Sequence, residues 1–359
     1  MNRDEIHTVV IGGGQAGLAV GYHLRQRGLP FVIVDENQRV GDVWRNRWDT
    51  LRLFTPGRLN GLPGMPFPCP SSAFPSRSEV ADYLESYART FELPVRTGMK
   101  VKRLSSAGGR FEVFCGDEVV SAKNVVVATG AFHHPRVPAF ASALDSAIIQ
   151  LHSKAYRNAS QLREGGVLVV GAANSGAEIA IEAARHQQVW LSGPDPGQEP
   201  TRAGSIPDRF FTPVMWLIAT RLTVRSAAGR KLRDRFLDPP RGIPLARVRR
   251  KDIIAAGIER VGRTTGVQEG YPSIEDGRVL QVSNVIWCTG FTPDFAWIDL
   301  PLPTTHRGWP IQDRGVVDSI PGLYFIGLPF LYSLSSALLG GVGRDARYIA
   351  DHMASTRRS

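Results

Sequence analysis

Hydrophobic residues follow two spacings along the chain, and the two spacings predict an alternation of strands and helices. Short apolar runs are typical of strands buried on both faces, and they occupy residues 7–11, 31–34, 125–130, 167–170, 189–191 and 285–290. Apolar residues three or four apart predict helices over residues 18–27, 78–91 and 177–185. The order strand, glycine turn, helix, strand occurs twice, which predicts two βαβ units.

The two βαβ units predict an α/β fold of two Rossmann-like dinucleotide-binding domains, each a three-layer ββα unit. The apolar runs at 125–130 and 285–290 both end in Thr-Gly and follow the first and second unit, so we expect the second domain to be inserted into the first. The expected first domain comprises residues 1–160 and 285–359, and the expected inserted domain comprises residues 161–284.

Residues 193–250 form the least regular stretch, rich in proline and arginine, and we expect them to build part of the substrate environment. The apolar residues 210–218 within this stretch are expected to pack inside their domain. Contact with a membrane surface and a cover over an apolar substrate are the alternatives. The run is too short to cross a bilayer and contains Pro213.

Composition narrows the function classes. A length of 359 residues suits about two domains, and 43% hydrophobic residues suffice for a core in each. Cys69, Cys115 and Cys288 form no CxxC pair, which disfavours a disulfide framework or a zinc site and favours a reducing, cytoplasmic compartment. The first six residues also lack the pattern of a secretory signal. A net charge of +10 suits an enzyme that binds several phosphate groups. Binding of nucleic acid is disfavoured, because aromatic residues for base stacking do not interleave with the arginines of 225–251.

The first glycine turn has the spacing of a dinucleotide-binding fingerprint. Gly12, Gly14 and Gly17 permit a tight turn and close backbone approach, while the helix that follows offers N–H donors and a positive dipole to a pyrophosphate. Asp35 lies at the end of the next strand, where a carboxylate accepts hydrogen bonds from ribose hydroxyls. The turn, strand, helix and acid together predict an adenosine with a free 2′-hydroxyl.

The second glycine turn departs from the pattern at its middle position, where Ala173 stands between Gly171 and Gly176. Asn174 and Ser175 add side-chain donors. The strand after this turn ends in Trp-Leu-Ser-Gly at residues 190–193, without a carboxylate to repel a 2′-phosphate, and Thr201 and Arg202 follow. These features favour NADPH over NADH.

A series of segments, kept in order along nearly the whole chain, resembles the class B flavin-dependent monooxygenases and most of all the YUCCA-like branch of the flavin-containing monooxygenases. The segments are GGGQAG (12–17), GDVWRNRWDTLRLFTP (41–56), MPFP (65–68), VVVATG (125–130), LHSKAY (151–156), GAANSGAEIA (171–180) and VIWCTGFTPD (285–294). The resemblance implies FAD on the first turn, NAD(P)H on the second, and oxygenation of a small organic substrate by O2 through a flavin C4a-(hydro)peroxide.

The resemblance also implies which residues bind the cofactors. On the FAD side they are Gly12, Gly14, Gly17, Asp35, Trp44, Arg45, Leu53 and Gly327. Gln15, Ala16, Glu36, Thr129, Gly130, Thr289 and Gly290 are also expected to bind a cofactor. On the NADPH side, with NADH as the alternative, they are Gly171, Asn174, Ser175, Gly176, Ser192 and Arg202. Trp44 and Arg45 would lie along the flavin, Leu53 near its ring, and Gly327 in the final segment that closes over it.

Catalytic residues are not fixed by the sequence, and His152 and Thr55 are the candidates. The family fingerprint FxGxxxHxxxW/Y keeps His152 and Tyr156 but has Ser146 and Ile148 in place of Phe and Gly, so a structural or domain-contact role for His152 is favoured. His133 and His134 lie near the expected hinge and are favoured as loop residues. Thr55 stands where the animal enzymes carry an asparagine, which disfavours simple amine oxidation.

Other functions remain open at this point. A disulfide reductase has the same two-domain plan but needs a redox-active cysteine pair, which is absent. A flavin reductase or oxidase that releases peroxide, and a flavin-binding redox sensor without catalysis, are the remaining alternatives. An indole-like compound, an amine, a sulfide or a ketone would each suit as the substrate, and a homodimer is an open possibility.

Overall fold

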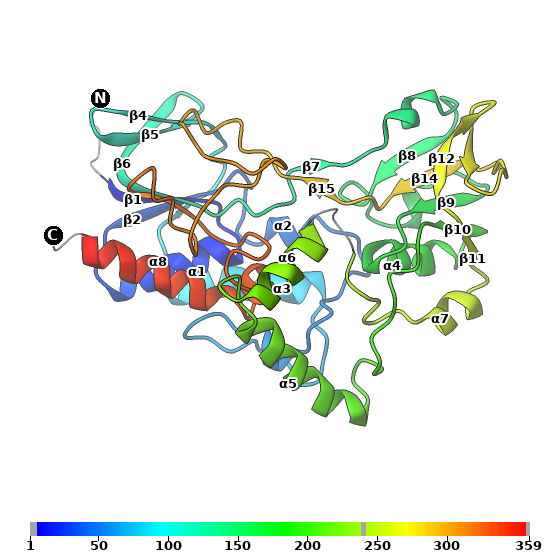
Figure 1. Ribbon diagram of the computed structural model, residues 1–359, viewed down its shortest axis with the longest axis horizontal. Helices are drawn as coiled ribbons and strands as arrows, with labels where there is room; N and C mark the ends of the chain where they lie inside the picture. The colour runs from blue at the N-terminus through cyan, green and yellow to red at the C-terminus, as the bar shows by residue number, and fades with distance from the viewer. Residues whose placement is uncertain (1–5, 238–241, 357–359) are drawn as a thin grey trace.

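The computed structural model describes residues 6–237 and 242–356. Two sheets lie toward opposite ends of the molecule, with two short strands running between them (Figure 1). The residues of the second sheet come from between β6 and β16 of the first. The predicted α/β fold, with one Rossmann-like domain inserted into another, is confirmed.

The first sheet is buried on both faces. Its order is β3-β2-β1-β6-β5-β4, and β16 also pairs with β6. The bounds are β1 (Ile6–Ile11), β2 (Phe31–Val34), β3 (Val95–Arg96), β4 (Val101–Ala107), β5 (Arg110–Cys115), β6 (Glu118–Val127) and β16 (Leu323–Phe325). Val10 packs in one hydrophobic cluster, whereas Val9 and Ile11 pack in a second one across the sheet. Because side chains alternate between the faces of a strand, burial on both sides accounts for the continuous apolar run.

Three helices cover one face of this sheet: α1 (Gln15–Gln26), α3 (Arg77–Thr90) and α8 (Val342–Thr356). Leu24 of α1 and Ile349 of α8 are fully buried in the same cluster, so the end of the chain completes a core begun near its start. Helix α3 begins at a capping box, in which the carboxylate of Glu79 accepts the N–H of Ser76 at 2.8 Å. The connecting segments include α2 (Asp42–Arg45), η1 (Gly57–Leu59) and η4 (Leu334–Ala337).

The second sheet is entirely parallel, in the order β11-β10-β9-β14-β8. Its strands are β8 (Ile149–His152), β9 (Val167–Val170), β10 (Val189–Ser192), β11 (Glu259–Val261) and β14 (Asn284–Trp287). Helices α4 (Asn174–Ala183) and α7 (Arg250–Ala255), the hairpin of β12 (Thr264–Gln268) and β13 (Tyr271–Ile274), and the turns η2 (Ala139–Ala143) and η3 (Ala159–Gln161) accompany it.

The expected domain boundaries at residues 160 and 285 need correction. Strand β8 lies before the first boundary and β14 spans the second, yet both pair within the second sheet. The chain instead changes sheets at β7 (His134–Pro135) and β15 (Phe291–Thr292), which pair antiparallel with Phe291 opposite Pro135. Spacing along the chain did not reveal this division because the pairing of β14 with β8 joins segments that are far apart in sequence.

Helix α5 (Ile206–Arg221) contains the apolar run that we expected to be packed inside its domain, and that expectation is wrong. Phe210 is 75% exposed and Leu217 is 51% exposed. Helix α5 lies below the first domain's helices in Figure 1, and α6 (Ala227–Leu237), which follows it, lies at the level of those helices. Among the described residues, no helix combines the length and the apolar character required to cross a membrane.

Candidate dinucleotide sites and the hinge

The first glycine turn combines two glycines that the fold requires with one that faces open space. Gly12 has a φ of +110°, and a Cβ on Gly17 would lie 1.9 Å from the carbonyl oxygen of Gly12. Gly14, by contrast, has no described atom within 4 Å of the position that its Cβ would take. Gly14 is also the N-cap of α1, and no described side chain caps the helix. The turn therefore leaves the N-terminus of α1 accessible to an anion.

Asp35 lies beside this turn, at the end of β2. Its carboxylate accepts the N–H of Gly13 at 2.5 Å and that of Asn37 at 2.8 Å, which fixes the carboxylate at the edge of the turn. Glu36, the next residue, is exposed and pairs with Lys100 at 3.7 Å. Of the two predicted acids, only Asp35 is held against the glycine turn.

The second turn repeats this geometry in the inserted domain. Gly171 has a φ of +109°, and a Cβ on Gly176 would lie 1.7 Å from the carbonyl oxygen of Gly171. Ala173, the N-cap of α4, has φ −76° and ψ −174°, close to the φ −77° and ψ −173° of Gly14. This backbone is extended and suits any residue, which explains why alanine can replace the middle glycine. Ser175 is half-buried in the first turn of α4.

Asn174 holds a later segment of the chain against the second turn. Its side-chain amide donates to the carbonyl of Pro244 at 3.0 Å, and its side-chain oxygen accepts the N–H of Ala246 at 3.0 Å. A Cβ on Gly242 would lie 2.3 Å from the Cβ of Ala173, so this segment runs directly beside the turn. This contact of Asn174 with the protein's own backbone was not predicted from the sequence.

Ser192, which was predicted to bind the nucleotide, faces the interior of the domain. Its fully buried hydroxyl donates to the carbonyl of Gly262 at 2.8 Å and accepts the N–H of Thr264 at 3.0 Å. Asp195, which was not singled out from the sequence, follows this strand, and its carboxylate pairs with Arg250 at 2.6 Å. Hydrogen bonding from Gly197, together with Arg250, lowers the pKa of Asp195.

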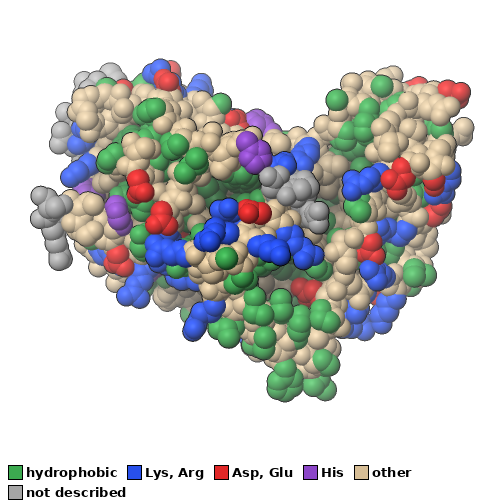
Figure 2. Space-filling model, in the orientation of Figure 1, with side chains coloured by type: hydrophobic (Ala, Val, Ile, Leu, Met, Phe, Trp, Pro, Cys, Tyr) green, Lys and Arg blue, Asp and Glu red, His purple; other side chains and the backbone are tan. Residues whose placement is uncertain are grey.

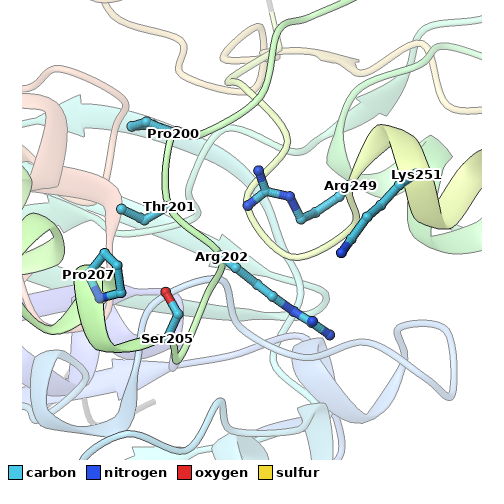
Figure 3. Close-up of a pocket in the computed structure, with 7 residues that line it drawn as sticks. All are labelled: Pro200, Thr201, Arg202, Ser205, Pro207, Arg249 and Lys251. Carbon is cyan, nitrogen blue, oxygen red and sulfur yellow. The ribbon is translucent and has the colours of Figure 1, made fainter.

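A basic pocket of about 400 Å³ lies between the start of α5 and the start of α7. Figure 3 shows Thr201, Arg202 and Ser205 on one wall, with Arg249 and Lys251 on the other. Three cationic side chains and Ser205 line this space, which is chemistry that suits a phosphate group, whereas the hydroxyl of Thr201 donates to Asp208 at 3.1 Å. The sequence predicted Arg202 and Thr201 here, but Arg249 and Lys251 are brought in by the fold.

The two predicted Thr-Gly strand ends lie close together where the chain passes from one domain to the other. Gly130 and Gly290 have φ values of +73° and +82°, so the backbone bends after each strand. The hydroxyl of Thr289 donates to the carbonyl of Arg136, so a hydrogen bond joins the two segments that connect the domains. The hydroxyl of Thr129 lies 3.2 Å from Nε2 of His133. These residues form a paired hinge, defined here as 129–136 and 289–294.

His152 belongs to this hinge. Its Nδ1 accepts the N–H of Lys154 at 3.1 Å, which leaves the proton on Nε2, and Nε2 donates to the carbonyl of Gly290 at 3.0 Å. Burial lowers the pKa of His152 and favours the neutral ring. Nδ1 of His133 likewise accepts the N–H of Asp294 at 2.8 Å. These contacts place His152 and His133 in the hinge, where their ring nitrogens bond to the backbone.

Residues of the 41–56 segment lie in different environments: some pack in the hydrophobic cores, and others lie at the surface against α3. Trp44 is half-buried and contacts the cores of both domains, and its Nε1 lies 3.4 Å from the side-chain oxygen of Gln15. Leu53 is buried in the first core. Arg45 binds Asp82 at 2.9 Å and Glu85 at 2.6 Å on α3, so its guanidinium is engaged in fixing α2.

Thr55 is occupied within its own loop. Its hydroxyl donates to the side-chain oxygen of Asn60 at 2.6 Å, and the buried Asn60 returns a hydrogen bond to the carbonyl of Thr55 at 2.9 Å. Gly327 follows β16 with a φ of +75°, and its Cβ would lie 2.8 Å from the Cβ of Ala16. This close approach places the final segment directly over the start of α1.

Two glycine turns, each at the carboxyl end of a strand with parallel neighbours, define a class of oxidoreductase that binds two dinucleotides. The chain belongs to the pyridine nucleotide-disulphide oxidoreductase family, whose pattern matches residues 9–204.

Individual proteins and a solved structure show which oxidoreductases the chain is similar to. The sequence is 42% identical over 354 residues to a CzcO-like oxidoreductase of Geobacillus kaustophilus, covering 96% of this chain and 97% of that protein. It is 35% identical over 183 residues to indole-3-pyruvate monooxygenase YUCCA1 of Oryza sativa, covering 50% of this chain and 45% of that protein. A flavin-containing monooxygenase from Stenotrophomonas maltophilia has a TM-score of 0.76 and 28% identity, covering 98% of this chain and 99% of that one. The predicted resemblance to flavin monooxygenases is confirmed.

Proposed function

We propose that the protein is an FAD-dependent monooxygenase that uses NADPH and O2 to oxygenate a small organic substrate. The observation that carries the proposal is the presence of two separate turns of the same geometry, one in each domain, on either side of a paired hinge. One dinucleotide would remain as the flavin cofactor and the other would deliver electrons. When bound, FAD would supply hydride acceptance and the activation of O2.

The residues of the first turn fit FAD. The open space over Gly14 and the uncapped N-terminus of α1 suit a pyrophosphate, and the carboxylate of Asp35 suits a ribose. Gln15, Trp44 and Leu53 would border the flavin end of the site. Arg45 and Thr55 would act by holding α2 and its following loop in place rather than by contact.

The second turn fits a nucleotide that must leave after each turnover. The methyl group of Ala173 keeps a pyrophosphate farther from the backbone than Gly14 does, and the Asn174-bound segment crowds the same region. The basic pocket would hold the 2′-phosphate of NADPH through Arg202, Arg249 and Lys251. The hinge would let the two sites approach for hydride transfer.

The three cysteines argue against a disulfide reductase despite the family's description. All three are free thiols, and burial raises the pKa of the Cys288 thiol to about 12 and that of Cys115 to about 11. A thiol that keeps its proton at neutral pH is a poor nucleophile. The thiols therefore do not supply the redox-active cysteine pair that a disulfide reductase requires.

The test is an anaerobic titration of the FAD-loaded protein with NADPH and then NADH, followed by rapid mixing with O2 while the flavin spectrum is recorded. Fast bleaching followed by a long-lived adduct band is the expected result. Direct return to oxidised flavin with stoichiometric peroxide, both without and with candidate substrates, would identify a reductase or oxidase. No bleaching with either nucleotide would leave a flavin-binding protein without this activity.

The basic pocket gives the same experiment a test of cofactor preference. Replacing both Arg249 and Lys251 with alanine should raise the KM for NADPH at least about tenfold, because each charge-assisted bond is worth about 1.5–3 kcal/mol, and should leave the KM for NADH nearly unchanged. Arg263→Ala is the matched control, since Arg263 is an exposed cation of the same domain outside the pocket. An equal effect on both nucleotides would rule out a 2′-phosphate site here.

A further inference from the structure

Helix α5 presents an apolar face to solvent. Ile206, Phe210, Val214 and Leu217 are 73%, 75%, 56% and 51% exposed. Their spacing of four, four and three residues places them on one side of the helix. Figure 2 shows this face as a hydrophobic projection at the lower edge of the molecule. Exposed apolar surface of this extent usually marks a site of contact with another body.

The other side of α5 is firmly attached to the protein. Asp208 is buried and accepts hydrogen bonds from the hydroxyl of Thr212 at 2.7 Å and the N–H of Gly204 at 2.9 Å. At the helix end, Arg344 donates to the carbonyl of Thr220 at 2.5 Å. Val224, just beyond, donates to the carbonyl of Tyr332 at 2.9 Å. The exposed face is therefore a fixed part of the surface.

Positive charge is concentrated in the segment of the chain that contains this helix. Residues 198–251 contain 13 Lys or Arg and 4 Asp or Glu, so they account for nine of the chain's ten net positive charges. The exposed cations in this stretch include Arg209, Arg221, Arg230, Lys231 and Arg235. One of the four acids, Asp208, is turned inward. Apolar side chains with a cationic surround are complementary to a bilayer of anionic lipid.

We propose that α5 and the basic residues around it dock the protein on the surface of a membrane that contains anionic lipid. The 16-residue helix is about 24 Å long, shorter than the hydrocarbon core of about 30 Å, and it carries arginines, so it would lie in the interface rather than cross it. Phe210 and its neighbours would enter the headgroup region, and the cations would contact lipid phosphates.

The charge distribution favours a lipid surface over a second copy of the chain. A twofold dimer through α5 would bring two copies of the same cationic surround together, and like charges across an interface oppose association. An anionic bilayer supplies the opposite charge over a wide area. This proposal does not depend on the proposed oxygenation chemistry.

The experiment is co-sedimentation of the full-length protein with vesicles of phosphatidylglycerol and phosphatidylcholine in equal parts, and with vesicles of phosphatidylcholine alone. We expect binding to the anionic vesicles that weakens as salt is added. Phe210→Ser combined with Leu217→Ser should lower the affinity at least about tenfold, since both large apolar side chains would no longer be buried in the lipid. Arg230→Gln combined with Lys231→Gln should also weaken binding and reduce its salt dependence.

Ile254→Ser is the matched control, because Ile254 on α7 is 75% exposed, the same as Phe210, but lies outside the apolar face of α5. It should bind anionic vesicles like the unaltered protein. Thermal unfolding verifies that each variant is folded, and Ile206→Ser replaces the double variant if that one is unstable. Failure of the unaltered protein to bind anionic vesicles would overturn the proposal, as would undiminished binding by the α5 variant. A dimer in sedimentation velocity that the α5 variant abolishes, without vesicle binding, would assign the face to a second copy.

Discussion

Replacing Gly14 with alanine should separate FAD binding from folding. In the protein without FAD, the new methyl group meets no described atom within 4 Å, and the extended backbone at φ −77° and ψ −173° accommodates alanine without strain. Alanine lowers the entropy of the unfolded chain, which stabilises by about 0.4–1 kcal/mol, but it is a poorer N-cap than glycine by a similar amount. We therefore expect the free energy of unfolding of the apoprotein to change by less than about 0.5 kcal/mol.

The effect on FAD should be much larger. The methyl group would project into the space that we assign to the pyrophosphate, and it would displace the phosphates from the N–H groups of α1. Losing one charge-assisted hydrogen bond costs about 1.5–3 kcal/mol, which corresponds to a decrease in affinity of about tenfold to a hundredfold. Fluorescence titration of the apoprotein with FAD measures the affinity, and thermal or urea unfolding of the same preparation measures stability.

Gly17→Ala provides the contrast. Its Cβ would lie 1.9 Å from a backbone oxygen, so the apoprotein itself should lose several kcal/mol of stability or fail to fold. If Gly14→Ala left the FAD affinity unchanged, the pyrophosphate would not pass over Gly14. If it destabilised the apoprotein as much as Gly17→Ala, the open space at Gly14 would be refuted.

Three further predictions concern stability and the hinge. Burial, with the nearby Arg27, lowers the pKa of His23 to about 4 in the folded protein, whereas its value in the unfolded chain is about 6.5. Because the unfolded chain therefore binds more protons as the pH falls, the free energy of unfolding should decrease from pH 7 to pH 5 by about 1 kcal/mol after allowance for partial exposure. Urea unfolding should show a weaker dependence of stability on pH for His23→Gln. Arg45→Met should lower the unfolding temperature by removing the contacts of α2 with Asp82 and Glu85, while the flavin bleaching rate at a permissive temperature stays within about twofold, and a much larger loss of rate would place Arg45 at the flavin. His152→Ala should slow NADPH-driven bleaching more than His152→Asn, because only asparagine offers a donor to Gly290, and equal rates in stopped-flow measurements would remove His152 from the hinge.

The glycine turns could be predicted from sequence because their requirement is local. Gly12 and Gly17 are enforced by backbone atoms within the turn or in the adjoining strand, and the strands 31–34 and 167–170 coincide with β2 and β9. The direction of a side chain was harder to predict. Ser192 ends a predicted strand, but its hydroxyl points inward because the pleat and the neighbouring β12 segment determine its orientation.

Features that depend on distant segments could not be predicted in the same way. Periodicity indicated an apolar stretch at 210–218, yet only the folded chain shows that little protein covers α5. Arg249 and Lys251 join Arg202 because α7 follows a long excursion. Similarly, the Thr-Gly strand ends were recognised, but assigning β14 to the second sheet required its pairing with β8 and β9.

The insertion has a consequence for synthesis on the ribosome. All five strands of the second sheet come from residues 149–287, whereas the first domain needs β16 and α8, which begin at residues 323 and 342. Translation proceeds at about 5–20 residues per second, so β1 and α1 are made many seconds before α8 can cover them. The inserted domain can thus complete its core first, and the amino-terminal domain finishes last. Slow or interrupted translation after residue 290 should expose the incomplete amino-terminal domain to chaperones and proteases.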